Sequence, residues 1–285
     1  MTQGAAKVAV IGAGMAGLAC AEALAEAGVA PVLFDKGRGA GGRMSTRRTE
    51  FGRFDHGAQY FTARSTEFRA ALEGWIAEGA AAEWRGRFVR IENGEVQPDT
   101  AAEPRFVGAP AMNALLSARA ERLGVRFNVR VEEIAREAEG WRLCGEDGAD
   151  LGRFAAVAVA TPAEQAASLL SGAPALAAEA AAARSAPCWA LMLAFEDVPE
   201  TGFDGAKVAD GPIRWIAREA SKPGRDPGEE GGDHRGRPLE PGGGDGRDAP
   251  ADREPRAAGL RERGAETLHR SRDQLRHGAF LHQPV

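Results

Sequence analysis

The hydrophobic pattern of the chain is clearest in its first 35 residues. Residues 8–11 form a short β-branched apolar run, which is typical of a buried strand. An alanine-rich stretch over residues 15–27 predicts a helix, and Gly28 closes it. A second apolar run at residues 31–34 is followed at once by Asp35. The pattern therefore predicts a strand, a helix and a second strand that ends in an acid.

Three glycines connect the first predicted strand to the helix. Gly12 permits a tight turn, Gly14 lets the backbone approach a pyrophosphate, and Gly17 lets helix and strand pack closely. The helix N-terminus favours phosphate charge, and Asp35 lies where an acid accepts hydrogen bonds from a ribose. A glycine turn alone is often structural. Because both strands, the helix and the acid occur in order, we predict dinucleotide binding.

Strand and helix patterns continue to residue 224. Ser65 or Thr66 is expected to cap a helix that runs to about residue 77. The turn Asn93-Gly94 predicts a hairpin that begins near residue 84. Further strands are expected at residues 125–134, 141–144, 154–160, 188–195 (strongly buried) and 213–217, and further helices at residues 111–123 and from Pro162.

Composition and charge narrow the function classes. The chain has 285 residues, of which 44% are hydrophobic, enough for one large domain or two smaller ones. Its net charge of −5 is spread out, which argues against nucleic acid as a partner. The N-terminus has the pattern of neither a signal peptide nor a membrane span, so a soluble, cytoplasmic protein is expected. Three cysteines are predicted to be reduced core thiols without metal-ligand spacing: Cys20, Cys144 and Cys188.

A glycine- and arginine-rich segment follows Asp35. Residues 36–48 have no apolar period and are predicted to form a loop. Glycine allows backbone conformations that are closed to other residues, and arginine neutralises phosphate. The alternative is a flexible basic linker. Its position argues against that, because the segment leaves the strand end where a dinucleotide would lie.

The order of these motifs resembles that of a known family. GAGMAGL, then an acid, then GxGGRMSTRR is similar to the FAD-binding opening of the flavin amine oxidase and renalase superfamily. In that superfamily the Gly-Gly-Arg segment, here Gly41 to Arg43, lies along the FAD diphosphate. Ordinary NAD dehydrogenases lack this second loop. The resemblance covers about residues 6–224 and implies that the chain binds FAD.

A second stretch carries the resemblance further. FDHGAQYFTAR, residues 54–64, is similar to a segment of bacterial renalase-like proteins that passes close to the isoalloxazine ring. Small residues such as Ala58 permit close approach to a flat ring, and Gln59 can supply a hydrogen bond. His56 is a candidate base. A histidine beside a carboxylate in a turn is more often structural, so no catalytic residue is assigned.

The resemblance also assigns residues later in the chain. It implies that Val131 touches the adenine end through its backbone and that Thr161 lies at a strand end near FAD. Trp189, in a P-x-W-A pattern, is either core or a wall of the substrate pocket. No cysteine or histidine has a context for a covalent link, so FAD is expected to be non-covalent. The predicted cofactor contacts are Gly12, Gly14, Met15, Gly17, Asp35, Lys36, Gly42, Arg43, Ala58, Gln59, Val131 and Thr161.

The expected fold class is α/β, with a Rossmann-like FAD-binding domain, an inserted α+β substrate domain and a disordered C-terminal tail. We assign residues 1–64 and 123–172 to the FAD-binding domain, residues 65–122 and 173–224 to the substrate domain, and residues 225–285 to the tail. No metal site is predicted. The sequence does not predict the oligomeric state.

The tail differs in composition from the rest of the chain. Residues 225–284 contain no Ile, Val, Met, Trp, Tyr or Lys, so most of the tail is predicted to be disordered, with a short helix at about residues 257–276 as an option. A frame-shifted end is favoured, because possible codons for residues 237–240, shifted by one base, read Ala-Pro-Trp-Ser, which is similar to the Pro-x-Trp-Ser continuation of the family. A natural flexible tail is the alternative, and histidine spacing argues against a metal-binding tail.

The function implied by the resemblance is that of a renalase-like FAD-dependent oxidoreductase. Its partners would be oxygen and a small reduced substrate, either a dihydronicotinamide isomer of NAD(P)H or an amine. Two alternatives stay open. One is an impaired FAD-binding remnant that lacks the family's C-terminal FAD segment, and the other is an NAD(P)-dependent dehydrogenase. A flavin absorption spectrum would distinguish the flavoprotein from the dehydrogenase.

Overall fold

The structure is a computed structural model that describes residues 7–100, 103–195, 199–225 and 277–284, the last of these as backbone only. The tail predictions of disorder and of a helix at residues 257–276 fall outside these residues. No helix within the described ranges is both long and apolar enough to cross a membrane. Nor do the described residues include a group of histidines, cysteines and acids arranged to hold a metal ion.

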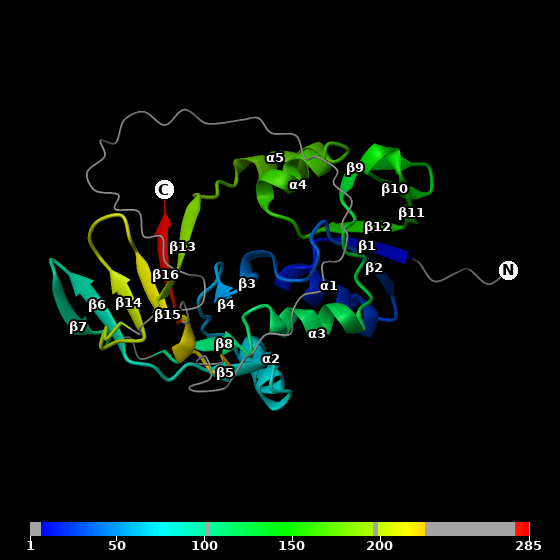
Figure 1. Cartoon of the computed structure of the whole chain (residues 1–285). Coiled ribbons are helices and arrows are strands. Elements are labelled where there is room, and N and C mark those ends of the chain that lie inside the picture. The colour runs from blue at the N-terminus through cyan, green and yellow to red at the C-terminus, as the bar shows by residue number, and fades with distance from the viewer. Residues whose placement is uncertain (1–6, 101–102, 196–198, 226–276, 285) are drawn as a thin grey trace, which may run out of the picture. The chain divides into compact units, whose positions relative to one another are not determined.

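The predicted strand–helix–strand unit is present. Three parallel strands form a sheet in the order β12-β1-β2 (Figure 1). Their bounds are Ala156–Val159 for β12, Lys7–Ile11 for β1 and Ala30–Phe34 for β2, and α1 spans Met15–Glu26. Helix α1 buries Gly17, Leu18 and Ala21. The predicted Rossmann-like α/β class is thus confirmed.

A second, antiparallel sheet packs against the first. It has the order β11-β10-β9, with β9 at Val131–Glu137, β10 at Gly140–Gly145 and β11 at Asp150–Phe154. Phe34 and Phe154 meet edge to face with ring centroids 5.9 Å apart, a geometry that aromatic pairs favour. Both rings belong to a buried cluster with Ala9, Ile11 and Val131. Two helices follow β12: α4 at Ala163–Leu169 and α5 at Pro174–Ala182.

The largest sheet has six strands in the order β13-β16-β15-β14-β6-β7. The predicted hairpin at Asn93-Gly94 joins β6 (Phe88–Glu92) to β7 (Glu95–Pro98). The remaining strands are β13 (Cys188–Phe195), β14 (Gly205–Val208), β15 (Trp215–Arg218) and β16 (His277–Pro284). Strand β16 lies between β13 and β15 (Figure 1). The sequence pattern did not predict this strand in the tail.

The segment after Asp35 is more ordered than predicted. Residues 46–48, expected to be loop, belong to strand β3 (Thr46–Thr49), which pairs with β4 (Gly52–Asp55). A short 3₁₀ turn, Gly42–Met44, precedes it. Strand β3 is mostly exposed and polar, so it carries no apolar period that sequence patterning can detect.

Helix α2 (Thr66–Ala77) begins as expected, because the Ser65 hydroxyl accepts a hydrogen bond from the Phe68 backbone N–H at 3.2 Å. Helix α3 spans Ala114–Arg122. It is preceded by β8 (Phe106–Gly108), which pairs with β5 (Ala81–Glu83).

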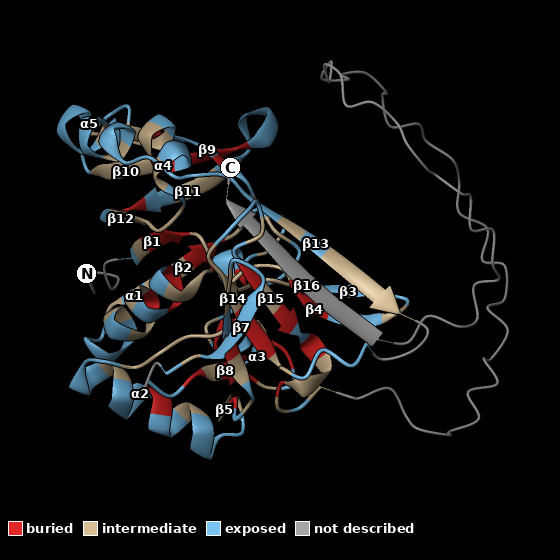
Figure 2. Ribbon diagram, turned by 90° about the vertical axis from the view of Figure 1, so that its left-hand side faces the viewer, coloured by how far each residue is buried: buried red, intermediate tan, exposed pale blue. Residues whose placement is uncertain are grey.

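Strand β13 exists but is not strongly buried, which corrects the prediction. Trp189 is 70% exposed and Leu191 is 52% exposed, and the strand is mainly intermediate in burial in Figure 2. Ala190 and Met192, which point to the opposite face, pack against a buried cluster. Cys188 is exposed as well, so it is not a core thiol, whereas Cys144 is buried as predicted.

Candidate functional site

A cavity of about 1340 Å³ lies at the carboxyl ends of β1 and β2. The glycine turn after β1, the loop after Asp35, residues 129–132 and residues 160–162 all contribute to its walls. Ligands of open α/β sheets bind in this position, where strands end and helices begin. Nine of the predicted cofactor contacts line it: Gly12, Gly14, Met15, Asp35, Lys36, Gly42, Arg43, Val131 and Thr161.

The glycine turn has the geometry that its sequence requires. Gly12 has φ +108°, and a Cβ there would lie 2.9 Å from the Ala160 carbonyl oxygen. A Cβ on Gly17 would lie 1.9 Å from the Gly12 carbonyl oxygen, so Gly17 serves the close packing of α1. At Gly14 a Cβ would meet no atom within 4 Å. Gly14 therefore leaves space for a ligand at the N-terminus of α1.

Asp35 ties this turn to the following loop. Its Oδ2 accepts a hydrogen bond from the Ala13 backbone N–H at 2.6 Å, and its Oδ1 accepts one from the Gly37 N–H at 2.7 Å. A carboxylate oxygen accepts more than one bond, so both oxygens keep capacity for ligand hydroxyls.

The loop with Gly42 and Arg43 closes on the same turn. Gly42 has φ +52°, and a Cβ there would lie 3.5 Å from the Gly14 Cα. Arg43 is exposed and lines the cavity. In the described part of the chain its guanidinium forms no ion pair. A cation at a helix N-terminus makes this end of the cavity suited to an anionic group.

The far walls carry one polar atom without a partner. The Thr161 hydroxyl is buried, lines the cavity and has no hydrogen bond among the described residues. Val131 is 7% exposed. Lys36 donates to the Gln165 side-chain oxygen at 2.9 Å. Buried hydroxyls are normally hydrogen-bonded, so Thr161 is a donor that a ligand or water would satisfy.

The cavity also extends to residues that the sequence did not single out. Phe68 and Trp75 of α2 line it, together with Arg119 of α3. Arg119 is buried and donates through Nε to the Glu22 carboxylate at 2.8 Å, and its guanidinium lies 5.4 Å from the Trp75 ring centroid. No local motif marks these positions, because they come from two helices that are far apart in the sequence.

Three predicted contacts are not in the cavity lining. Gly17 packs inside α1. The Ala58 backbone N–H donates to the Arg43 carbonyl oxygen at 2.8 Å. Gln59 is 7% exposed, with its amide bonded to the Asp55 and Gly57 carbonyl oxygens and to Lys222. Contact of Ala58 and Gln59 with a flavin ring stays a prediction.

His56, the candidate base, is partly buried next to these residues. Burial lowers its pKa, and the nearby charge of Arg47 lowers it further. Its Nδ1 is buried without a hydrogen-bond partner among the described residues. Both causes favour the neutral imidazole, and His56 does not line the cavity.

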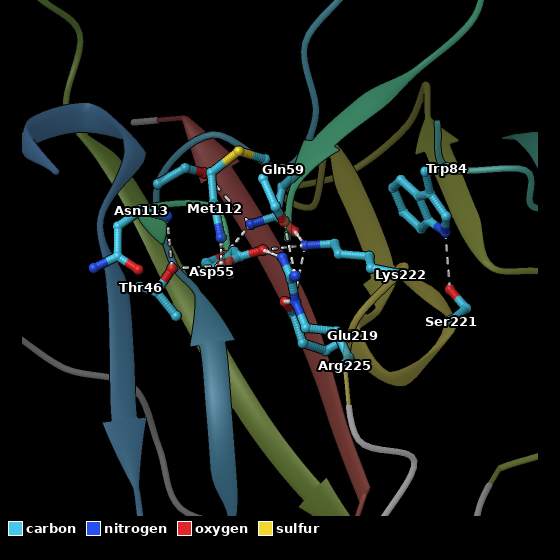
Figure 3. A network of polar contacts seen from close by, with 12 residues as sticks. Thr46, Asp55, Gln59, Trp84, Met112, Asn113, Glu219, Ser221, Lys222 and Arg225 are labelled. Carbon is cyan, nitrogen blue, oxygen red and sulfur yellow. Dashed lines mark hydrogen bonds and ion pairs between the residues drawn. The ribbon is translucent and has the colours of Figure 1, made fainter. Parts of the chain in front are cut away.

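A buried charge cluster, which sequence reasoning missed, is bonded through Asp55 to Thr46 of β3 (Figure 3). We call Asp55, Glu219, Lys222 and Arg225 the buried ion quartet. Their side chains are between 0% and 5% exposed. The Lys222 Nζ lies 3.1 Å from the Asp55 Oδ2 and 2.8 Å from the Glu219 Oε2. Arg225, assigned to the tail from sequence, instead pairs with Asp55 and Glu219.

The quartet separates the acidities of its two carboxyl groups. Burial pushes the pKa of Asp55 upward, but Lys222 and Arg225 outweigh it, so the pKa lies well below its usual range. Burial raises the pKa of Glu219 to about 7, against the pull of Lys222 and with the repulsion of Asp55. Asp55 is therefore the firmly ionised partner.

Comparisons with known proteins agree with this geometry. Residues 10–74 match the family model described as NAD(P)-binding Rossmann-like domain, and residues 89–218 match the one described as flavin containing amine oxidoreductase. The fold and the cofactor cavity, with these matches, define a flavin oxidoreductase. Over residues 89–218 the chain is thus similar to flavin containing amine oxidoreductases, and over residues 10–74 it is similar to NAD(P)-binding Rossmann-like domains.

Solved structures of low sequence identity share the fold. A triple mutant of putrescine oxidase aligns with TM-score 0.62 and 12% identity over 98% of this chain and 75% of that one. An oxidoreductase from Methanosarcina mazei aligns with TM-score 0.60 and 11% identity over 98% and 79%. A CLA-producing fatty acid isomerase from P. acnes aligns with TM-score 0.56 and 13% identity over 74% and 73%. At these identities the likeness concerns the fold.

Proposed function

We propose that the chain binds FAD non-covalently in this cavity and acts as a renalase-like oxidoreductase in the cytoplasm. The observation that carries the proposal is the pairing of two glycine elements at one cavity wall. Gly14 has no atom within 4 Å of its Cβ direction, and Gly42 of the second loop approaches it. A glycine turn at a helix N-terminus lets the backbone approach a dinucleotide diphosphate closely.

Each part of the ADP half of FAD would have a partner in the cavity. The N-terminus of α1 and Arg43 would bind the diphosphate, and the Asp35 carboxylate would accept hydrogen bonds from the ribose hydroxyls. The backbone of Val131 would contact the adenine end. The unpartnered Thr161 hydroxyl supports a polar ligand in the same cavity.

FAD, when bound, would supply the redox chemistry, which is hydride acceptance from a reduced substrate and reoxidation by oxygen to give peroxide. The substrate we propose is a dihydronicotinamide isomer of NAD(P)H or an amine. The residues that line the cavity would bind and orient the cofactor. No side chain is assigned an acid–base role, because hydride transfer itself moves no separate proton.

A titration with FAD tests the cofactor. Absorbance and flavin fluorescence of the purified full-length chain should reach saturation at one FAD per chain. Arg43→Met should weaken binding about tenfold, as expected for one lost charge-assisted contact of about 1.4 kcal/mol. Arg48→Met removes a neighbouring exposed arginine of β3 that does not line the cavity, and should leave the Kd unchanged. Equal effects of both substitutions would contradict the proposed diphosphate site.

Anaerobic reduction tests the activity. The FAD-loaded chain is mixed with a dihydronicotinamide isomer of NADH or with putrescine, and bleaching of the flavin band is followed. Bleaching by one of them identifies the substrate class, and peroxide formation on admitting air tests reoxidation by oxygen. Full FAD occupancy with no bleaching by either would favour the impaired remnant, and binding of NAD⁺ without FAD would favour the dehydrogenase.

A further inference from the structure

Lys222 has no donor left for a substrate or cofactor. Its ammonium group donates to three oxygens: Asp55 Oδ2 at 3.1 Å, Gln59 Oε1 at 3.2 Å and Glu219 Oε2 at 2.8 Å. A lysine carries three N–H donors, so all of them are used inside the protein (Figure 3). The side chain is also 0% exposed. Any influence of Lys222 on the cofactor must therefore pass through the groups that it holds.

The first of these groups, Asp55, bonds to residues from distant parts of the chain. Its Oδ2 faces Lys222 and Arg225. Its Oδ1 accepts hydrogen bonds from the Thr46 hydroxyl at 2.6 Å and from the Met112 backbone N–H at 3.0 Å. With its carboxylate held on both sides, Asp55 fixes the end of β4 and the turn that follows it, residues 55–59.

This turn supports the backbone of Arg43. The Ala58 N–H donates to the Arg43 carbonyl oxygen at 2.8 Å. A Cβ on Gly57 would lie only 2.2 Å from the same oxygen, so the two segments are in the closest contact that their backbones permit. A shift of the turn by a few tenths of an ångström must therefore move Arg43, which lines the cavity.

We propose that Lys222 is a positioning residue for the loop that contains Gly42 and Arg43. Through Asp55 and the turn at residues 55–59, it holds Arg43 where the FAD diphosphate binds. The inference rests on the proposed function for the identity of the ligand. The positioning itself concerns only this chain's own residues. It explains why a buried cation from the segment after β15 is bonded to the end of β4, 167 residues away.

A double-mutant cycle measures the connection between Lys222 and Arg43. The FAD Kd is determined for the wild-type chain, Arg43→Met, Lys222→Met and the double variant. Each single substitution should weaken binding about tenfold, and Arg43→Met should add less than about twofold in the Lys222→Met background, because Arg43 is already displaced there. Effects that multiply would overturn the positioning role, since they would show that Lys222 acts independently of Arg43.

Two further variants separate positioning from loss of folding. Lys222→Met leaves two buried carboxylates with one cation and is expected to be destabilised. Glu219→Gln/Lys222→Met removes one charge of each sign and keeps the Asp55–Arg225 pair, so the same cycle can be run on a better-balanced protein. Lys207→Met removes a lysine of β14 that pairs with Asp99 and should leave the FAD Kd unchanged.

Hydrogen exchange supplies a readout without cofactor. In the ligand-free protein, the Ala58 amide should exchange at least about tenfold faster in Lys222→Met than in the wild type or Lys207→Met, because its bond to Arg43 loosens. If the wild type binds no FAD, the proposed function fails and this exchange experiment still decides the positioning role. Unchanged protection of Ala58 in Lys222→Met would overturn the inference even if FAD binds.

Discussion

At the scale of single residues, Gly14 and Gly17 show that two glycines of one motif have different tasks. Gly17→Ala places a methyl group 1.9 Å from the Gly12 carbonyl oxygen and is expected to reduce the free energy of unfolding by roughly 3 kcal/mol, the upper range for overpacking. Gly14→Ala meets no atom within 4 Å and should cost less than about 1 kcal/mol.

The same pair should behave in the opposite way in cofactor binding. The methyl group of Gly14→Ala points into the space proposed for the diphosphate, so the FAD Kd should rise at least about tenfold. Urea unfolding gives the stability of both variants, and FAD titration gives the Kd. A Gly14→Ala chain with unchanged FAD affinity would be incompatible with diphosphate binding at the turn.

The raised pKa of Glu219 predicts how the free energy of unfolding depends on pH. Because its folded pKa of about 7 lies above its ordinary value of 4.5, it contributes stability that is fully present below pH 4.5 and is lost as the pH rises through 7. Asp55, whose pKa is lowered from 3.8, contributes the opposite dependence, present above pH 3.8 and lost in acid. Between pH 4.5 and 7, Glu219 alone should therefore reduce the free energy of unfolding by up to a few kcal/mol.

The measurement compares pH series rather than single values. Urea unfolding of the wild type and of Glu219→Gln is followed from pH 4.5 to 7.5, and the wild-type free energy of unfolding minus that of Glu219→Gln should fall by up to a few kcal/mol as the pH rises. Other titrating groups cancel in this difference. Glu103→Gln, which removes an exposed partner of Arg64, should run parallel to the wild type. A Glu219→Gln series that also runs parallel would show that Glu219 does not titrate in this range.

At the scale of elements, β13 shows why burial is harder to predict than secondary structure. Its apolar residues predict a strand, but they occupy both faces, and only Ala190 and Met192 meet the core. Trp189→Ser should therefore change the free energy of unfolding by less than about 0.5 kcal/mol, whereas Met192→Ala should cost about 2 kcal/mol. Denaturant midpoints of the two variants test this. A large loss for Trp189→Ser would mean that its ring is covered in the folded protein.

Sequence patterns predicted those helices, strands and turns that depend on residues close together in the sequence. The glycine turn, α1 and the Ser65 cap of α2 each depend on residues close in sequence, and all are present. Strand β3 was missed because it is polar on an exposed hairpin. Nine of the twelve predicted cofactor contacts line one cavity, because the motif order indicates which strand ends meet.

The buried ion quartet was beyond sequence reasoning for a physical reason. Arg225 and Asp55 are separated by 170 residues, and nothing in the composition near either residue marks it as buried. A lysine, an arginine and two acids are ordinarily surface residues. Only the folded arrangement brings their opposite charges together and compensates the cost of removing them from water.

At the scale of the whole molecule, the cavity is lined by segments that are far apart in the sequence, among them residues 12–45, 129–132 and 160–162. A ligand that contacts all three stabilises the folded state as a unit. With free FAD at 100 times its Kd, the free energy of unfolding should rise by about 2.7 kcal/mol. The urea midpoint should increase with FAD concentration while the m-value stays constant, because the same surface is exposed on unfolding.

Fragments of FAD can show which part of the cofactor stabilises the folded protein. ADP carries the diphosphate, the ribose and the adenine, so it should raise the urea midpoint by itself, although less than FAD at equal concentration. Riboflavin lacks all three groups and should have little effect. In Arg43→Met the gains from FAD and from ADP should both fall, because the lost cation faces the diphosphate that they share. Equal stabilisation by riboflavin and FAD would instead mean that the glycine turn and the Arg43 loop do not recognise the diphosphate.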